Sequence, residues 1–231
     1  MKLTSFSKVR ALAEKRKGGK EALEKLLVKP KSPRQLANIS DDRYLSMMTK
    51  CVFQAGFNWK VIENKWHSFE EAFHGFNPKG LVHMAPEKWE AYQEDTRVVR
   101  NWIKIKTVLD NAHFVLDEAE QHGSFGKWFS KWPVSDQIGL MAHLKKNGSR
   151  LGGNTAMYFL RFMGKDSFIL SMDVVGRLKA SGLEIKDSPS SKKDLSLVQD
   201  AFNTWHEETG LPYTHLSRIA GMSIGKNYHP Q

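Results

Sequence analysis

The sequence contains very little cysteine. Its single thiol, Cys51, excludes a disulfide within the chain and excludes a zinc or iron–sulfur site built from several cysteines. No stretch approaches the ~18 consecutive apolar residues of a membrane-spanning helix, and the first residues lack the apolar core of a signal peptide. We therefore expect a soluble, cytoplasmic protein of a reducing compartment, with no membrane partner.

The sequence also lacks any alternation of apolar and polar residues long enough to predict a β-strand. Apolar residues instead recur every three or four positions, as in the helix that we expect after Ser40-Asp-Asp42. Further helices are expected over about 59–66, 68–75, 86–94, 95–107, 108–121 and 194–207, with a last one reaching Gly225, and a polar loop over 182–193. With 231 residues, the chain suits one domain or two small helical lobes, all-α and of about ten helices.

The positive charge is unevenly distributed. The chain has a formal net charge of +10, and residues 1–31 alone carry ten Lys or Arg against three acids. This segment has leucines at helical spacing, and Lys29-Pro-Lys-Ser-Pro33 ends it because two nearby prolines block a helix. We expect a basic helical N-terminal extension (1–31) and a main domain (34–231). We expect the lysines to form a solvated helical face, and a further hypothesis is that they add an electrostatic hold on nucleic-acid phosphates.

Two adjacent glycines, Gly152 and Gly153, separate two segments with helical spacing, Asp136 to Lys146 and Thr155 to Met163. A glycine turn frees backbone N–H groups at a helix N-terminus, where a phosphate can bind. The predicted hairpin therefore spans about 136–163. Its expected phosphate contacts are Lys146, Arg150, Gly152, Gly153, Asn154 and Thr155. The alternative is that the glycines form a turn and nothing more.

A lone acid, Asp173, follows Phe168-Ile-Leu170 shortly after this hairpin. An acid that opens a helix is commonly its N-cap. The order of helix, glycine turn, helix, short link and Asp nevertheless resembles the helix-hairpin-helix DNA glycosylases. That resemblance implies an all-α fold with two helical lobes around a base-binding cleft, and it implies a catalytic role for Asp173.

A second motif lies upstream, at Phe53-Gln-Ala-Gly-Phe-Asn-Trp59. It is followed in order by Val61-Ile-Glu-Asn-Lys65, Phe69-Glu-Glu-Ala-Phe73, Phe76-Asn-Pro78, Val98-Val-Arg-Asn101, Lys104-Ile-Lys106, Asn111-Ala112 and Gly123-Ser-Phe125. This string resembles the DNA-3-methyladenine glycosylase I family, with its Gln-Ala-Gly-Leu-Ser-Trp and Phe-Asp-Pro motifs. The resemblance covers about residues 41–178.

The resemblance implies that the chain flips a damaged base out of double-stranded DNA and holds it in a pocket. Trp59 is the motif tryptophan and is expected to stack on that base, with Phe53 and Gln54 nearby. For Phe57 we expect core packing instead. Bifunctional relatives carry a lysine directly before the hairpin Thr-Ala, where this chain has Asn154. The resemblance therefore implies a monofunctional enzyme without lyase activity. We also expect the protein to be a monomer.

The chain departs from the family at several positions. Cys51 stands where the family has its pocket glutamate, and the opening Tyr-His-Asp-x-Glu-Trp-Gly segment is missing. A thiol is a weak donor and cannot replace the carboxylate. The family's zinc ligands fall on Asp173 and Arg177, so we expect no metal and no other cofactor.

Asp173 would stabilise the positive charge that builds on the sugar or orient the attacking water, and a helix N-terminus keeps it ionised. The sequence thus predicts a DNA repair glycosylase that hydrolyses the N-glycosidic bond of an alkylated adenine such as 3-methyladenine. Two alternatives stay open at this point. One is a glycosylase for another modified base, and the other is a helix-hairpin-helix protein that binds DNA without catalysis.

Overall fold

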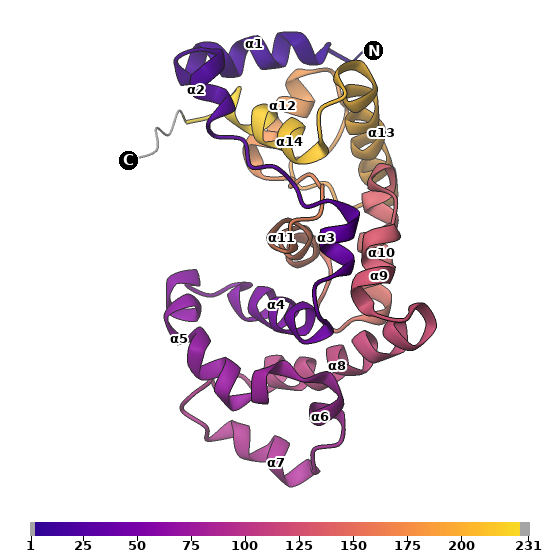
Figure 1. Ribbon diagram of the computed structural model, residues 1–231. Helices are drawn as coiled ribbons and strands as arrows, with labels where there is room; N and C mark the ends of the chain where they lie inside the picture. Colours follow the sequence, from indigo (N-terminus) through magenta and orange to yellow (C-terminus); the bar gives the residue numbers. More distant parts are fainter. Residues whose placement is uncertain (1–2, 227–231) are drawn as a thin grey trace. The chain divides into compact units, whose positions relative to one another are not determined.

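The computed structural model describes residues 3–226, and this part of the chain contains helices and no strand (Figure 1). The α-helices are α1 Phe6–Lys17, α2 Lys20–Glu24, α3 Pro33–Ala37, α4 Asp41–Gln54, α5 Trp59–Ala72, α6 Pro78–Val82, α7 Pro86–Glu90, α8 Trp102–His122, α9 Phe125–Lys131, α10 Gln137–Asn147, α11 Gly153–Met163, α12 Met172–Ala180, α13 Lys192–Thr209 and α14 Tyr213–Met222. Three short 3₁₀ helices, η1 His74–Phe76, η2 Ala91–Gln93 and η3 Val134–Asp136, lie between them. Within residues 3–226, no helix has both the length and the apolar character needed to cross a bilayer.

The expectation of about ten helices was too low, because several short helices carry no periodic signal. In two places the expected boundaries were also wrong. The segments 59–66 and 68–75 form one helix, α5, and the segments 95–107 and 108–121 are replaced by the single helix α8. The α8 helix begins at Trp102 because Asn101 caps it, its side chain accepting a hydrogen bond from Lys104 N at 3.2 Å.

The chain forms two compact units. Unit 1 takes the residues up to Pro30, Pro133–Gly139 and the residues from Asp166 onward, and unit 2 takes Lys31–Trp132 and Leu140–Lys165. The N-terminal segment, expected as a basic helical extension, shares unit 1 with the C-terminal helices. Each unit is described by itself below.

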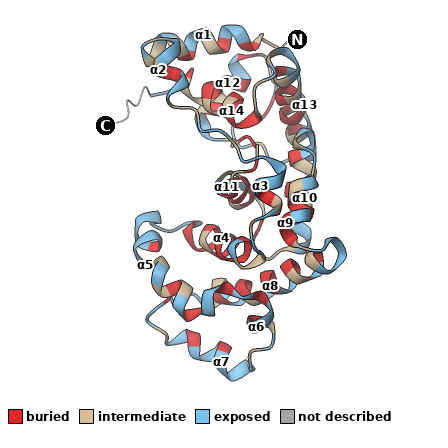
Figure 2. Ribbon diagram, in the orientation of Figure 1, coloured by how far each residue is buried: buried red, intermediate tan, exposed pale blue. Residues whose placement is uncertain are grey.

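The core of unit 1 joins the N-terminal segment to α12, α13 and α14, whose buried faces are red in Figure 2. Phe6 of α1 is fully buried, and its ring centroid lies 5.2 Å from that of Trp205. Phe168 stacks on Phe202 with centroids 4.4 Å apart and planes at 5°. Buried aromatic pairs of this kind add about 0.5–1.5 kcal/mol each beyond the burial of their area. The basic segment therefore contributes to the folded core, while most of its described lysines are exposed, namely Lys8, Lys15, Lys20, Lys25 and Lys29.

The core of unit 2 is built around Tyr44 of α4. Its ring lies 4.9 Å from Phe125, 5.2 Å from Phe129 and 6.4 Å from Phe159, measured between centroids. The buried hydroxyl donates to Leu36 O at 2.8 Å, so the aromatic cluster leaves that polar group satisfied. This packing holds α4, α9 and α11 together. It thereby fixes α4, which precedes the link to Trp59, and α11, which follows the glycine turn.

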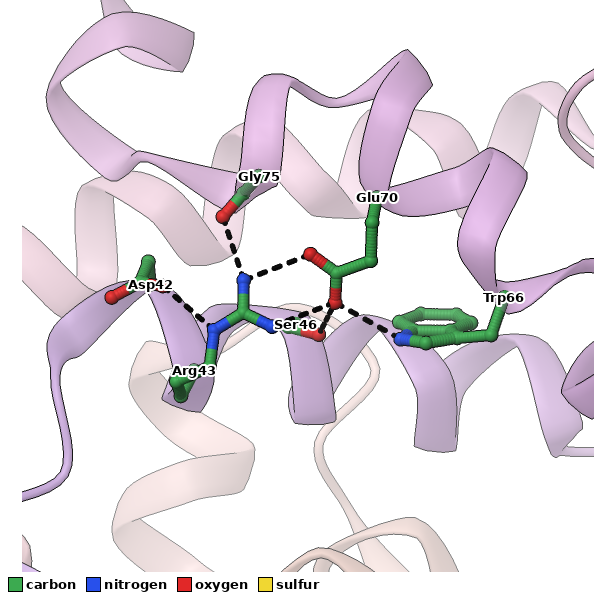
Figure 3. A network of polar contacts seen from close by, with 6 residues as sticks. All are labelled: Asp42, Arg43, Ser46, Trp66, Glu70 and Gly75. Carbon is green, nitrogen blue, oxygen red and sulfur yellow. Dashed lines mark hydrogen bonds and ion pairs between the residues drawn. The ribbon is translucent and has the colours of Figure 1, made fainter.

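A polar network fixes α5 against α4 (Figure 3). The Glu70 carboxylate accepts hydrogen bonds from Arg43 at 2.9 and 2.8 Å, from the Ser46 hydroxyl at 2.6 Å and from the Trp66 indole at 3.1 Å. Arg43 also donates to Gly75 O at 2.8 Å. Burial alone would raise the pKa of Glu70, but the hydrogen bonds from Arg43 and Ser46 outweigh it and lower that pKa. The network thereby orients the helix that begins at Trp59.

Candidate functional site

The predicted hairpin is present in the structure as α10, a turn and α11. The second helix begins at Gly153, whose φ of +54° is in the left-handed region, and Arg150 in the turn also has a positive φ, +58°. Buried Asn111 holds the turn from beneath: its Nδ2 donates to Ser149 O at 3.1 Å, and its Oδ1 accepts from Ser149 N at 2.8 Å. The sequence analysis had Asn111 in a motif without assigning it a role.

A cavity of about 340 Å³ lies beside this turn, within unit 2. It is lined by Val52, Ala55, Lys145, Arg150, Leu151, Gly152 and Thr155. Three of the predicted phosphate contacts line it (Arg150, Gly152 and Thr155), while Lys146, Gly153 and Asn154 are exposed. Two cationic side chains and a helix N-terminus at one cavity form an environment that favours an anion.

Lys104 adds a third cation near the cavity. Its Nζ donates to Phe53 O at 3.1 Å and to Ala55 O at 2.8 Å, which satisfies carbonyls at the C-terminal end of α4. Burial and the nearby charge of Arg150 lower the pKa of Lys104. Lys104 therefore fixes the C-terminal end of α4, next to Gly56 of the Gln-Ala-Gly motif. The sequence analysis had not assigned this role to Lys104.

Trp59 lies at the start of α5 and is 38% exposed. Its ring contacts two aromatic side chains of α11 edge-on, Tyr158 at 4.9 Å and Phe162 at 5.8 Å between centroids. Phe162 is 39% exposed. The site therefore offers an accessible aromatic surface to which both helices contribute, and sequence reasoning had found only the tryptophan.

Phe57, expected in the core, is instead 44% exposed, so that expectation was wrong. The residue falls in the short link between α4 and α5, where no helical face turns it inward. With Trp59 and Phe162 it adds to the exposed apolar surface of unit 2.

Asp173 lies in unit 1, as the second residue of α12. The N-cap of that helix is Ser171, whose hydroxyl accepts from Val174 N at 3.3 Å. The capping role considered for Asp173 therefore belongs to Ser171. Asp173 is half-buried in the first helical turn, where the helix dipole favours a negative charge, and its neighbour Met172 is 89% exposed.

Comparison with known proteins identifies the domain that contains Trp59. Residues 36–149 match the family profile described as methyladenine glycosylase. Residues 36–149 of this chain are therefore a methyladenine glycosylase domain. A DNA-3-methyladenine glycosylase of Haemophilus influenzae is 25% identical over 130 residues, which are 48% of this chain and 70% of that protein.

Solved structures are similar over more of the chain. The 8-oxoguanine DNA glycosylase of Methanocaldococcus jannaschii has a TM-score of 0.57 at 14% identity, and the match covers 93% of this chain and 92% of that one. A 3-methyladenine DNA glycosylase I of Staphylococcus aureus has a TM-score of 0.48 at 20% identity, covering 66% and 86%. The first likeness confirms the predicted all-α helix-hairpin-helix DNA glycosylase fold.

Three predicted pocket residues of this methyladenine glycosylase domain have buried side chains. Phe53, Cys51 and Gln54 are 1%, 3% and 2% exposed. The Phe53 ring packs against Phe69 with centroids 4.9 Å apart, so it belongs to the core. Burial raises the pKa of the Cys51 thiol to about 12, which keeps it neutral at physiological pH. The Gln54 Oε1 atom has no hydrogen-bond partner.

The residues at the family's zinc positions do not fit a metal. Arg177 is cationic and donates to Ser223 Oγ at 2.6 Å and to Ser223 O at 2.9 Å. A guanidinium has no free lone pair with which to ligate an ion. Across residues 3–226, no group of three or more His, Cys, Asp or Glu side chains is arranged to hold a metal.

Proposed function

We propose that this chain is a monofunctional DNA repair glycosylase that releases an alkylated adenine such as 3-methyladenine from double-stranded DNA. The methyladenine glycosylase match over residues 36–149 is the observation that carries this proposal. The proposal includes a monomer that acts in the cytoplasm, in line with a single free cysteine that is buried.

DNA binding is assigned to the hairpin turn. Backbone N–H groups at Gly152, Gly153 and Asn154, together with Lys145 and Arg150, would contact phosphates beside the cavity. Such contacts position the duplex and carry no sequence information. A repair enzyme needs this property, because its lesions occur in any sequence.

Base binding is assigned to the aromatic surface around Trp59. A flipped base can stack on the exposed face of that ring, while Tyr158 and Phe162 support its other side. The polar network around Glu70 fixes the helix that carries Trp59, so the ring needs little reorganisation when a base arrives.

Catalysis is assigned to the Asp173 carboxylate. As the C1′–N bond breaks, positive charge develops on the sugar, and an ionised carboxylate stabilises it. Water adds its oxygen to C1′ and releases a proton, and a cationic alkylated base leaves as a neutral molecule. Asn154 supplies no amine for a Schiff base, so the product is an abasic site in an uncut strand.

A second candidate substrate is a neutral modified base, and Cys51 favours it. A buried, neutral thiol at the position of the family's glutamate removes the carboxylate that would attract a cationic adenine. In this case the same Trp59 and Asp173 act on an uncharged base, which leaves less readily and needs more help from the carboxylate.

A base-release screen tests the proposal. The purified chain is incubated with duplexes that each hold one alkylated, deaminated or oxidised purine, and the released base is identified by chromatography. We expect release of alkylated adenine, and strand breaks only after alkali treatment. Release of a neutral base alone would select the second candidate. Tight binding without release from any duplex would contradict catalysis altogether.

A further inference from the structure

The segment that follows α14 lies directly against the Asp173 carboxylate. Gly225 has a φ of +74°, and a Cβ added to it would lie 2.0 Å from Asp173 Oδ1 and 2.6 Å from Cγ. No real side-chain carbon fits at that distance. The backbone of Gly225 therefore occupies one side of the carboxylate and restricts the rotamers that Asp173 can adopt.

This close approach continues along the first turns of α12. A Cβ added to Gly221 would lie 3.4 Å from Val174 Cγ2, and one added to Gly176 would lie 3.9 Å from Ile224 Cδ1. These distances are those of ordinary van der Waals contact, so α12 and the end of α14 pack against each other along this face. The position of Gly225 is thus part of a packed interface within unit 1.

Two arginines hold the segment 222–225 in place. Arg16 of α1 donates from Nε to Met222 O at 3.0 Å and from Nη2 to Gly225 O at 2.5 Å. Arg177 of α12 donates to the hydroxyl and the carbonyl of Ser223 at 2.6 and 2.9 Å. That hydroxyl donates in turn to Ala220 O at 2.6 Å.

The electrostatics favour this arrangement. The carbonyls at the C-terminal end of α14 have no partners within the helix and carry the negative end of its dipole. The Arg16 and Arg177 guanidiniums donate hydrogen bonds at this end of the helix, and each of them donates to more than one oxygen atom. The geometry thus connects the basic N-terminal segment to Asp173 through the backbone of Gly225.

We propose that Gly225, held by Arg16 and Arg177, is a positioning residue that fixes the Asp173 carboxylate for glycosidic cleavage. This inference rests on the proposed function, in which Asp173 is the catalytic carboxylate. It also gives the basic N-terminal segment a role in the chemistry through Arg16, separate from any attraction between its lysines and DNA.

Gly225→Ala tests the contact. The new methyl group displaces the carboxylate, and a misplacement of about 1 Å can cost on the order of 10²-fold in rate. We expect single-turnover base excision to slow by about that factor, with lesion-DNA affinity kept within a few fold. Gly210→Ala is the matched control, since Gly210 in the same unit has a φ of +66° and nothing within 4 Å of an added Cβ. It should lower the melting temperature by a similar amount and leave the excision rate unchanged.

The double variant Gly225→Ala, Asp173→Asn shows whether the effect passes through Asp173. If it does, Gly225→Ala slows the wild-type background and has no further effect once the carboxylate is gone. Equal slowing in both backgrounds would overturn the inference. An Asp173→Asn enzyme as fast as the wild type would overturn the proposed role of Asp173. A slow Asp173→Asn enzyme beside a Gly225→Ala enzyme at the control rate would overturn the positioning role alone.

Variants of Arg16 test the inference without depending on the folding of Gly225→Ala. Arg16→Gln should slow excision, and Arg16→Lys should restore part of the rate by keeping one donor at the carbonyls. Arg10→Gln removes the same charge from α1, where Arg10 pairs with Glu14 and Glu24. A loss shared by both Gln variants reports attraction to DNA, so equal excision rates for the two would contradict positioning by Arg16.

Discussion

Replacing Trp59 by alanine tests the base-binding surface. The variant removes a motif side chain that is accessible, at 38% exposure, and that contacts two aromatic rings of α11. Base stacking on an aromatic ring contributes about 1–3 kcal/mol by alanine substitution, which corresponds to a loss of roughly 5- to 150-fold in affinity for a duplex with a flipped lesion.

The cost to folding should be smaller than for a core tryptophan. Truncation of a fully buried tryptophan costs about 3–5 kcal/mol. Trp59 loses edge-on contacts with Tyr158 and Phe162 at 4.9 and 5.8 Å, and much of its ring already faces solvent. We therefore expect Trp59→Ala to destabilise the fold by about 1–2 kcal/mol, so that the variant stays folded during the assay.

The assay compares the affinity for a lesion duplex made resistant to cleavage with the affinity for an undamaged duplex of the same sequence. Trp59→Ala should reduce the first affinity and leave the second unchanged. Trp132→Ala is the control, because Trp132 is half-buried in the same unit and packs on Trp128 and His143 instead. A Trp59→Ala variant that keeps the wild-type ratio of the two affinities would refute the stacking role.

Three further predictions concern other parts of the molecule. Gly153→Val places a β-branched residue at a φ of +54° and should weaken binding to damaged and undamaged duplexes by the same factor, measured by titration of each. Burial raises the pKa of Cys51 to about 12 from an ordinary value near 9.0. The free energy of unfolding should therefore fall as the pH rises through that interval, by up to about 1.4 kcal/mol per pH unit. The fall should be less steep in Cys51→Ser. Glu70→Gln should cost about 1–2 kcal/mol at neutral pH by denaturant unfolding. Since the pKa of Glu70 is lowered in the fold, that difference should shrink as pH falls through the folded value.

The helix pattern was predictable where apolar spacing is regular. The hairpin helices and α4 follow from it directly. The break expected between 107 and 108 is absent: Thr107 is buried inside α8, and its hydroxyl is satisfied within the helix by donating to Lys104 O at 2.6 Å. The helix α8 instead begins after Asn101, which is its N-cap. This cap can be recognised only once the backbone at Asn101 is known to be extended.

The site was predictable in part. Trp59 came from its motif, but Tyr158 and Phe162 belong to an α11 segment that is apolar nearly all round and therefore reads as core. Their spacing of four residues places both on one face of the helix, and only the tertiary structure shows that this face meets Trp59. Gly225 gave no signal, because its closeness to Asp173 depends on packing between segments far apart in the sequence.

The most direct test of the account is single-turnover base release by the wild-type enzyme and by Asp173→Asn, on each lesion duplex from which the wild type releases a base. Asparagine keeps the shape of the side chain and so the approach of Gly225, while it removes the negative charge. The account predicts that the rate falls by roughly tenfold for a cationic base, which leaves readily, and by roughly 10²–10³ for a neutral base, with lesion-DNA affinity kept within a few fold. Release at the wild-type rate by Asp173→Asn would contradict the claim that this carboxylate carries the chemistry.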